Sequence, residues 1–412
     1  MDPPGQARAP GRRQTRDGKG HMAKLIMLDL LKRLVELKGS DLHLIAGLLP
    51  AVRIHGELKA LDDYPRLLPE AVKEIVYSIL SDEQKTSFEH DPEHRNELDF
   101  GYGVSGLGRF RINVHRQRGA VSAAVRALAT EIPKLGDLGL PEAVKLFTTA
   151  KRGLVLVTGP TGSGKSTTLA ALIDEINATR CDHIVTIEDP IEYLHNSKKS
   201  YITQREVGPA SDTLSFKNAL KYTLRQDPDV IMVGEMRDFE TIGIAITSAE
   251  TGHLVFGTLH TTNATQTIDR IVDVFPAEQQ SQIRVQLASN LLGVLSQILL
   301  PRVDLPGRCL ATEILIANFA IRNNIRTGKT ESLYQTLQTA SEEGMQTLDQ
   351  SLLKLCKEGK IDYETARPYI YDKSMHEKLK AFPKTADRPP QAFGPQTFQS
   401  RATYNPLPWE EK

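Results

Sequence analysis

The fold is decided by residues 153–168, which read GLVLVTGPTGSGKSTT. The stretch begins with an uninterrupted apolar run at 154–157, which is typical of a strand buried on both faces. A glycine-rich loop of the form G-x-x-x-x-G-K-[ST] follows at 159–166, and residues 167–177 have a helical pattern. Between a strand and a helix, such a loop can turn its backbone N–H groups toward phosphate oxygens. The stretch therefore predicts a nucleotide site, with a glycine turn that binds nothing as the weaker alternative.

The same loop predicts the cofactors. Lys165 is expected to reach the β- and γ-phosphates of ATP, and Ser166 is expected to coordinate Mg²⁺. The helix that begins there adds the positive end of its dipole. The residues expected to bind nucleotide in this loop are Gly159, Pro160, Thr161, Gly162, Ser163, Gly164, Lys165, Ser166 and Thr167.

Outward from the loop, residues 140–300 alternate apolar runs with helical patterns. The runs lie at 153–158, 183–187, 230–233 and 254–258. This alternation predicts an α/β fold, in which helices cover a parallel sheet. The carboxyl ends of parallel strands meet at one edge of the sheet, where ligands bind. Polar residues that follow these runs are therefore candidates for the site.

Acidic residues follow two of the runs. Glu235 lies just after the third run, where a carboxylate could hold Mg²⁺, and a solvated turn acid is the alternative. Glu188, Asp189 and Glu192 follow the second run, and spacing alone neither chooses among them nor excludes an acidic surface turn. Hydrolysis of ATP needs an acid near the metal and a group that orients water. These acids are the candidates for both roles.

Two histidines bracket the last run: His253 precedes it and His260 follows it. His260 is therefore expected at the same sheet edge as Lys165. It could sense the γ-phosphate by hydrogen bonding, since the ordinary histidine pKa of about 6.5 permits either charge state. A purely structural histidine is an equal alternative for His260.

Composition disfavours several other classes of protein. Among 412 residues, 51 are Lys or Arg and 51 are Asp or Glu, so a zero net charge gives no general attraction to nucleic acid. No apolar run approaches the roughly 18 residues of a membrane helix, and the best candidate, at 291–300, includes Ser296 and Gln297. Three dispersed cysteines form no CxxC pair and fit a reducing, cytoplasmic compartment.

The chain is predicted to have a small N-terminal α+β domain and a larger core. In the N-terminal part, helices are expected at 26–37 and over 66–90, and strands at 51–54 and 109–114. Three helices are expected after residue 300. The predicted parts are a disordered or cloning-derived tail at 1–22, the N-terminal domain at 23–133, a linker at 134–140, the core with its C-terminal helices at 141–378 and a Pro-rich tail at 379–412.

Four motifs in this order resemble the secretion ATPase superfamily. They are GPTGSGKSTT at 159–168 (Walker A), TIEDPIEY at 186–193 (Asp box), DPDVIMVGEMRD at 227–238 (Walker B) and TGHLVFGTLHTTNA at 251–264 (His box). Within it, the chain resembles the type IV pilus retraction ATPases (the PilT family), because AIRNNIRT at 320–327 is similar to their AIRNLIRE helix. Assembly and type II secretion ATPases usually carry a four-cysteine zinc insertion, which this chain lacks the cysteines to form.

The resemblance implies a RecA-like P-loop ATPase core, a PAS-like N-terminal domain and a hexameric ring. It also implies a Mg²⁺-dependent ATPase motor for pilus retraction, at the cytoplasmic face of the inner membrane. Its partners would be the membrane platform protein and, indirectly, pilin, with no nucleic acid. The alternatives are a pilus-assembly or type II secretion ATPase and the accessory retraction paralogue. From the residues alone, a nucleotide-binding switch and a nucleic-acid translocase are also considered.

The resemblance also assigns roles to residues. Glu192 would be the catalytic glutamate that polarises water, and Glu235 the Walker B acid that holds Mg²⁺ directly or through water. His260 would be the His-box residue, with His253 as its companion in nucleotide binding. Arg111 and Arg126 would contact the γ-phosphate when the N-terminal domain closes, so that ATP binding favours closure and hydrolysis releases it.

Overall fold

The structure is a computed structural model that describes residues 16–54, 56–91, 95–128, 131–208 and 211–380. Contacts group the described residues into two compact units. The first comprises residues 16–81 with 113–127, and the second comprises residues 82–112 with 128–380. The domain boundary expected at 134–140 stays a prediction.

The N-terminal part of the chain is built on a six-stranded sheet with strand order β3-β2-β1-β6-β5-β4. Its strands are β1 (Asp41–Leu44), β2 (Ala51–Ile54), β3 (Glu57–Ala60), β4 (Glu97–Val104), β5 (Gly108–Gln117) and β6 (Ala120–Ala127). Its helices are α1 (Arg16–Glu36), α2 (Pro69–Tyr77) and α3 (Asp82–His90), which confirms the α+β character and the two helices expected over 66–90. Strand β4, helix α3 and residues 108–112 of β5 belong to the second unit.

The structure differs from expectation at the start of the chain. Helix α1 begins at Arg16, whereas the composition predicts an unfolded tail as far as residue 22. Met27, Leu30 and Leu34 are fully buried and hold the helix in place. A helix nucleated there extends toward the N-terminus at low cost, because each added residue gains a hydrogen bond. Residues 1–15 and 381–412 lie outside the described residues, so the tails expected there stay predictions.

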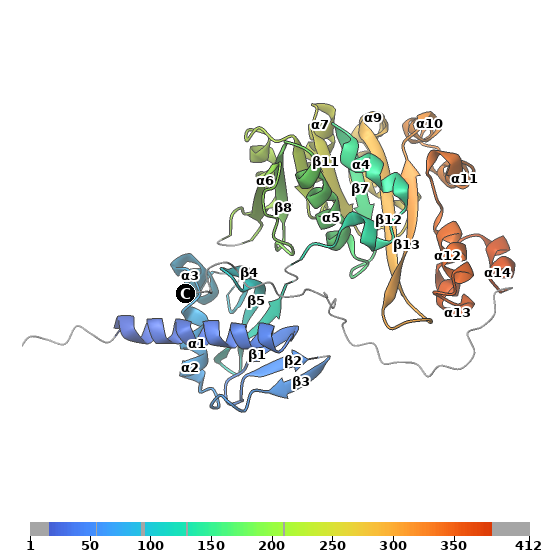
Figure 1. The fold of residues 1–412 in the computed structure, drawn as a ribbon. Coiled ribbons are helices and arrows are strands. Elements are labelled where there is room, and N and C mark those ends of the chain that lie inside the picture. Colours follow the sequence, from blue (N-terminus) through green and yellow to red (C-terminus); the bar gives the residue numbers. More distant parts are fainter. Residues whose placement is uncertain (1–15, 55, 92–94, 129–130, 209–210, 381–412) are drawn as a thin grey trace, which may run out of the picture. The chain divides into compact units, whose positions relative to one another are not determined.

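A seven-stranded sheet, with strand order β13-β12-β7-β11-β10-β8-β9, is the centre of the second unit (Figure 1). Its strands are β7 (Gly153–Thr158), β8 (His183–Glu188), β9 (Tyr201–Glu206), β10 (Val230–Val233), β11 (Leu254–Leu259), β12 (Leu291–Pro301) and β13 (Arg308–Ile316). All neighbouring pairs are parallel except β12 and β13, which are antiparallel. The four predicted runs are therefore all strands, and the parallel α/β core is confirmed.

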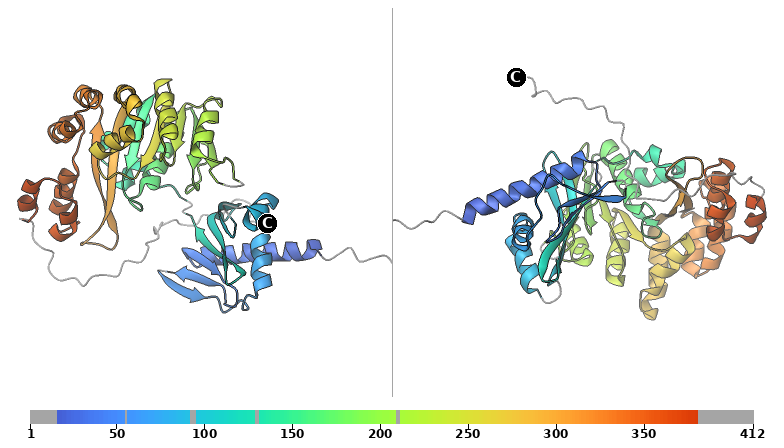
Figure 2. Two further views of the ribbon diagram at one scale, coloured as in Figure 1. Left: turned by 180° about the vertical axis from the view of Figure 1, so that it is seen from behind. Right: turned by 90° about the horizontal axis from the view of Figure 1, so that it is seen from below.

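Helices flank this sheet on both faces (Figure 2). They are α4 (Lys145–Thr149), α5 (Lys165–Thr179), α6 (Phe216–Thr223), α7 (Phe239–Glu250), α8 (Ala264–Asp273), α9 (Ala277–Asn290), α10 (Phe319–Thr327), α11 (Leu333–Thr339), α12 (Leu348–Lys357), α13 (Tyr363–Ala366) and α14 (Lys373–Lys380). Leu154 and Leu156 of β7 pack with α6 to α11, and Val155 and Val157 pack with α4 and α5. Successive strand residues point to opposite faces, so a strand covered on both sides must be apolar throughout.

The sequence pattern does not predict β9, β12 or β13. The apolar run at 291–300 suggests only a short membrane candidate, and residues after 300 suggest only helices. Strand β12 instead pairs with β7, and β13 extends the sheet from β12 as the second strand of a hairpin. Helices α10, α11 and α12 confirm the C-terminal helices expected beyond it. None of the helices in the described part of the chain has the length and apolar character to span a membrane.

Candidate active site

The glycine-rich loop joins β7 to α5 and requires glycine at several positions. Gly159, Gly162 and Gly164 have φ angles of +144°, +78° and +90°, which other residues adopt only with strain. A Cβ on Gly159 would lie 2.2 Å from the carbonyl oxygen of Gln297 and 2.6 Å from Ser163 Oγ. Helix α5 begins at Lys165, so the free N–H groups of its first turn adjoin the loop. The loop can therefore bind an anion with backbone donors.

Strand β12 supports the loop from beneath. Gln297 is 1% exposed, and its Nε2 donates to the carbonyl oxygen of Ser163 at 2.8 Å. The adjacent Ser296 shares a 2.8 Å hydrogen bond with Thr158 at the end of β7. These two supporting residues escaped the sequence-based prediction of the site. Their only signal was a pair of polar residues inside an apolar run.

Lys165 is the first residue of α5, and its side chain contacts the glycine loop. Its Nζ donates to the carbonyl oxygens of Gly159 at 2.8 Å and Pro160 at 3.1 Å. Burial lowers the pKa of Lys165, while the negative charges of Glu235 and Glu192 oppose that shift. Buried Ser163 Oγ has no hydrogen-bond partner among the described residues. A free hydroxyl, a partly buried ammonium and a glycine loop together fit the phosphates of a nucleotide.

Glu235 and His260 meet at the carboxyl ends of β10 and β11. His260 Nε2 lies 2.9 Å from Glu235 Oε1, and Arg237 also donates to that oxygen. Burial opposes ionisation of Glu235, but the hydrogen bonds and positive charge of Arg237, with help from His260, hold its pKa below the ordinary value. Glu235 is therefore a carboxylate at neutral pH, which is the state a Mg²⁺ ligand requires.

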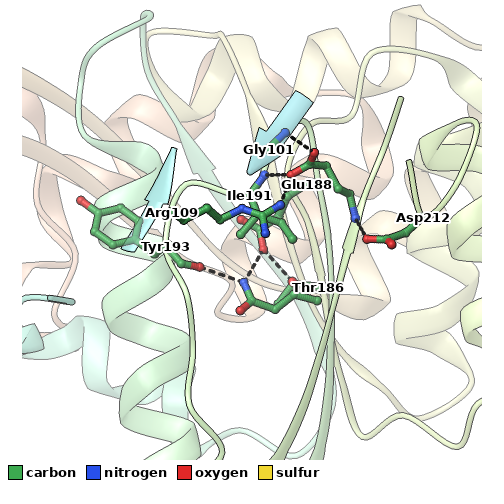
Figure 3. A network of polar contacts seen from close by, with 9 residues as sticks. Gly101, Arg109, Thr186, Glu188, Ile191, Tyr193 and Asp212 are labelled. Carbon is green, nitrogen blue, oxygen red and sulfur yellow. Dashed lines mark hydrogen bonds and ion pairs between the residues drawn. The ribbon is translucent and has the colours of Figure 1, made fainter. Parts of the chain in front are cut away.

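The acids at the end of β8 and just after it have different environments. Glu188 is buried, and it accepts hydrogen bonds from Thr186 Oγ1 at 2.6 Å and Gln204 Nε2 at 3.0 Å (Figure 3). Burial raises the pKa of Glu188, and these hydrogen bonds oppose the shift. Burial also raises the pKa of Asp189, against the positive charges of Arg111 and Arg237. Glu192 is exposed and acts electrostatically on Lys165. Of the three, Glu188 alone is buried, and Glu192 is the one whose charge acts on Lys165.

His253 does not join this cluster. It precedes β11, whereas His260 follows it, so the strand separates them by roughly 20 Å at about 3.3 Å per residue. Its Nδ1 bonds the carbonyl oxygen of Ser248 at 2.9 Å, at the opposite edge of the sheet from Lys165. Within one chain, His253 therefore lies away from Lys165, Glu235 and His260. Its role as a companion of His260 in nucleotide binding, which only the family resemblance implies, stays a prediction.

The two predicted arginines have acidic partners. Arg111 Nε lies 3.6 Å from Asp99 Oδ1, with both side chains about half exposed. Arg126 belongs to the first unit and donates to Asp41 Oδ1 at 2.8 Å. The contact of either arginine with a γ-phosphate stays a prediction. The remaining loop residue, Thr167, shares a 2.9 Å hydrogen bond with Tyr193 OH, which links α5 to the segment that carries Glu192.

Comparison with known proteins places this geometry in context. The family described as type II/IV secretion system protein matches residues 121–309. The chain is 49% identical to the type IV pilus retraction ATPase PilT of Pseudomonas aeruginosa, over 80% of this chain and 93% of that protein. It is 42% identical to the type IV pilus ATPase PilU of the same organism, over 82% and 86%. A crystal structure of the pilus retraction motor PilT with bound ADP superposes with a TM-score of 0.78 at 50% identity, and covers 87% of this chain and 99% of that one.

Proposed function

The chain belongs to the family of type IV pilus retraction ATPases, and we propose that it acts as a hexameric, Mg²⁺-dependent motor for pilus retraction. It is an ATPase with a RecA-like core. The observation that carries the proposal is the clustering of Lys165, Glu192, Glu235 and His260 around one glycine loop. Its identity to the retraction ATPase PilT, at 49%, exceeds its identity to the paralogue PilU, at 42%.

Nucleotide binding uses the loop and the start of α5. Backbone N–H groups of residues 159–167 would surround the phosphates, and Lys165 would exchange its two carbonyl partners for phosphate oxygens. Ser166 and Glu235 would hold Mg²⁺, Glu235 directly or through water. When bound, Mg²⁺ would neutralise charge on the phosphates. In the described part of the chain, no three His, Cys, Asp or Glu side chains gather into a metal site, so phosphate and water would supply the other ligands.

Hydrolysis requires a water held in line with the γ-phosphate. Exposed Glu192 is the carboxylate that would orient and polarise it, because Glu188 is committed to buried hydrogen bonds. His260, bonded to Glu235, would register whether a γ-phosphate is present. Lys165 would neutralise charge on the phosphates, Glu192 would direct water and Glu235 would hold the metal. With His260, the roles are thus divided among four residues.

Arg111 and Arg126 would couple ATP hydrolysis to domain movement. Positive charge that reaches the γ-phosphate only after closure makes ATP binding favour the closed arrangement, and cleavage removes that preference. The domain at 23–133 and the linker at 134–140 would carry this movement in a six-membered ring. The ring would act on the platform protein at the cytoplasmic face of the inner membrane, and through it on pilin.

Complementation tests the proposal. The chain is expressed in a type IV piliated bacterium that lacks its retraction ATPase, and twitching and surface pili are measured. We expect the wild-type chain to restore twitching, and Glu192→Gln to leave the cells piliated but non-motile at equal protein level. Glu278→Gln, which changes an exposed glutamate in the first turn of α9, is the matched control and should restore twitching. Restoration of piliation in a strain without the assembly ATPase would instead identify an assembly motor.

A further inference from the structure

Glu206 is the last residue of β9, and both oxygens of its carboxylate accept hydrogen bonds. The residue is 5% exposed. Its Oε1 accepts the Gly101 N–H at 2.8 Å, and its Oε2 accepts the Ile191 N–H at 3.2 Å and pairs with Arg109. Figure 3 shows Gly101, Arg109 and Ile191 converging on this network. One buried anion therefore joins strands β4 and β5 to the segment after β8.

The segment that Glu206 holds is the one that carries Glu192. Ile191 and Tyr193 flank Glu192, and β9 side chains bind the backbone of both. Glu206 accepts the Ile191 N–H, and Gln204 Nε2 donates to the Tyr193 carbonyl oxygen at 2.8 Å. Residues 204 and 206 are two apart on a strand, so their side chains lie on the same face. The backbone on either side of Glu192 is thus fixed by β9.

The contact with β4 leaves no room for a side chain at position 101 unless the ends of the Arg109 and Glu206 side chains move. A Cβ on Gly101 would lie 2.4 Å from Arg109 Nη2 and 2.6 Å from Glu206 Oε2. Two positions along the same strand, a Cβ on Gly103 would meet nothing within 4 Å. The tight approach is therefore specific to the point where β4 meets Glu206, and the chain supplies its own control.

We propose that Glu206 is a positioning residue for ATP hydrolysis, which couples the placement of β4 and β5 to the placement of Glu192. The inference rests on the proposed function, because that function assigns Glu192 its role. A shift of β4 and β5 would change the partners of Glu206, and with them the anchor of Ile191. Since misplacement of a reacting group by about 1 Å can cost on the order of 100-fold in rate, such a small change would affect turnover.

The test compares steady-state ATPase kinetics of the full chain with two variants. In Glu206→Gln, only one side-chain oxygen remains as an acceptor, so the amide NH₂ must face a donor among its present partners. Gly101→Ala keeps every charge but pushes the Glu206 side chain away from β4. It provides an independent test if Glu206→Gln fails to fold. We expect each variant to lower kcat by about 10- to 100-fold with less than about twofold change in KM for ATP. A fluorescent ATP analogue should bind with unchanged affinity.

Two controls separate positioning from loss of stability. Gly103→Ala adds the same methyl group to β4 where space is open. Asp182→Asn removes the negative charge from the partly buried Arg180–Asp182 pair, of 2.6 Å, at the amino end of β8. Both should keep wild-type kcat. The double variant, Gly101→Ala with Glu206→Gln, should have a kcat no lower than that of the slower single variant. Both substitutions disrupt the same contact between β4 and Glu206, so their effects should not add.

Unchanged kcat in both Glu206→Gln and Gly101→Ala would overturn the inference, as would a loss confined to KM. Additive losses in the double variant would also overturn it. Failure of the proposed function looks different, since Lys165→Ala and Glu192→Gln would then retain hydrolysis. If those two variants lose hydrolysis while Glu206→Gln and Gly101→Ala keep it, the proposed function stands and only the role of Glu206 falls.

Discussion

At the scale of single residues, the site is governed by how each charged group is held. Lys165 is partly buried, yet two carbonyl oxygens and two nearby carboxylates keep its ammonium in a favourable environment. Glu188 and Glu192 differ by four positions but serve different ends. Glu188 is buried in a hydrogen-bond network, whereas Glu192 is exposed beside the loop. The difference in burial, which spacing cannot reveal, separates the structural acid from the catalytic candidate.

Lys165→Ala should abolish ATP turnover. The substitution removes the side-chain cation expected to neutralise the β- and γ-phosphates, and loss of one such group typically costs at least about 100-fold in kcat. Phosphate release by the purified chain with Mg²⁺ measures it. Lys151→Ala, an exposed lysine near the opposite end of β7, is the control and should keep wild-type turnover. Hydrolysis by Lys165→Ala within about twofold of wild type would show that the site lies elsewhere.

The burial of His195 leads us to expect that the folded protein loses stability in mild acid. Burial lowers its pKa from 6.5 to about 4, with Asp174 opposing the shift. The unfolded chain therefore binds a proton on this residue between about pH 6.5 and 4 that the folded chain does not, and stability falls as the pH drops through this window. Each pKa unit corresponds to about 1.4 kcal/mol, so the full loss approaches roughly 3 kcal/mol.

Urea unfolding at pH 7.5 and pH 5 measures this loss. Wild type and His90→Gln, which changes an exposed histidine of α3, should lose stability equally, and His195→Gln should lose less. Equal losses in all three proteins would mean that His195 is not the titrating group.

At the scale of elements, the hairpin of β12 and β13 does more than extend the sheet. Gln297 holds the carbonyl oxygen of Ser163, and the backbone of Gln297 lies where a Cβ on Gly159 would fall. Strand β12 therefore fixes the shape of the glycine loop from below. This explains two polar residues in a strand that is otherwise buried and apolar.

Gln297→Ala should weaken nucleotide binding. The substitution leaves the buried carbonyl oxygen of Ser163 without its hydrogen-bond donor, which costs about 1–3 kcal/mol. If nucleotide binding must restore the shape of the loop, that cost lowers the affinity by roughly 5- to 150-fold. Titration with a fluorescent ADP analogue measures it. The matched control is Gln346→Ala, because the Nε2 of Gln346 also donates to a backbone carbonyl oxygen, that of Thr312, at 3.0 Å. Equal affinity in both variants would show that β12 does not shape the loop.

Much of the fold can be predicted from sequence because buried parallel strands are continuous apolar runs. Strands β7, β8, β10 and β11 follow this rule and carry the glycine loop, Glu235 and His260 at their carboxyl ends. The prediction fails where a strand or a side chain is held by contacts with residues that are distant in the sequence. Strand β12 combines apolar residues with Ser296 and Gln297, whose partners are distant in sequence. Glu206 likewise gives no local signal, because its partners Gly101 and Ile191 are not its neighbours in the sequence.

At the scale of the whole molecule, ATP cleavage would be joined to movement. The core would supply the glycine loop, the acid that holds Mg²⁺ and the glutamate that directs water. The predicted N-terminal domain would supply Arg111 and Arg126, which in the single chain pair with Asp99 and Asp41. Ion pairs between partly exposed groups are worth only about 0–1 kcal/mol, so a γ-phosphate could take these arginines from their present partners. Closure in a ring would thus depend on the nucleotide.

The central claim is that these arginines reach the triphosphate in the assembled protein. Electron microscopy of the full chain with Mg²⁺ and a non-hydrolysable ATP analogue measures the positions of Arg111 and Arg126 directly. We predict closed subunits in which their guanidinium nitrogens lie within about 3.2 Å of γ-phosphate oxygens. Subunits that all bind the analogue while both arginines stay paired with Asp99 and Asp41, away from the phosphate, would contradict it.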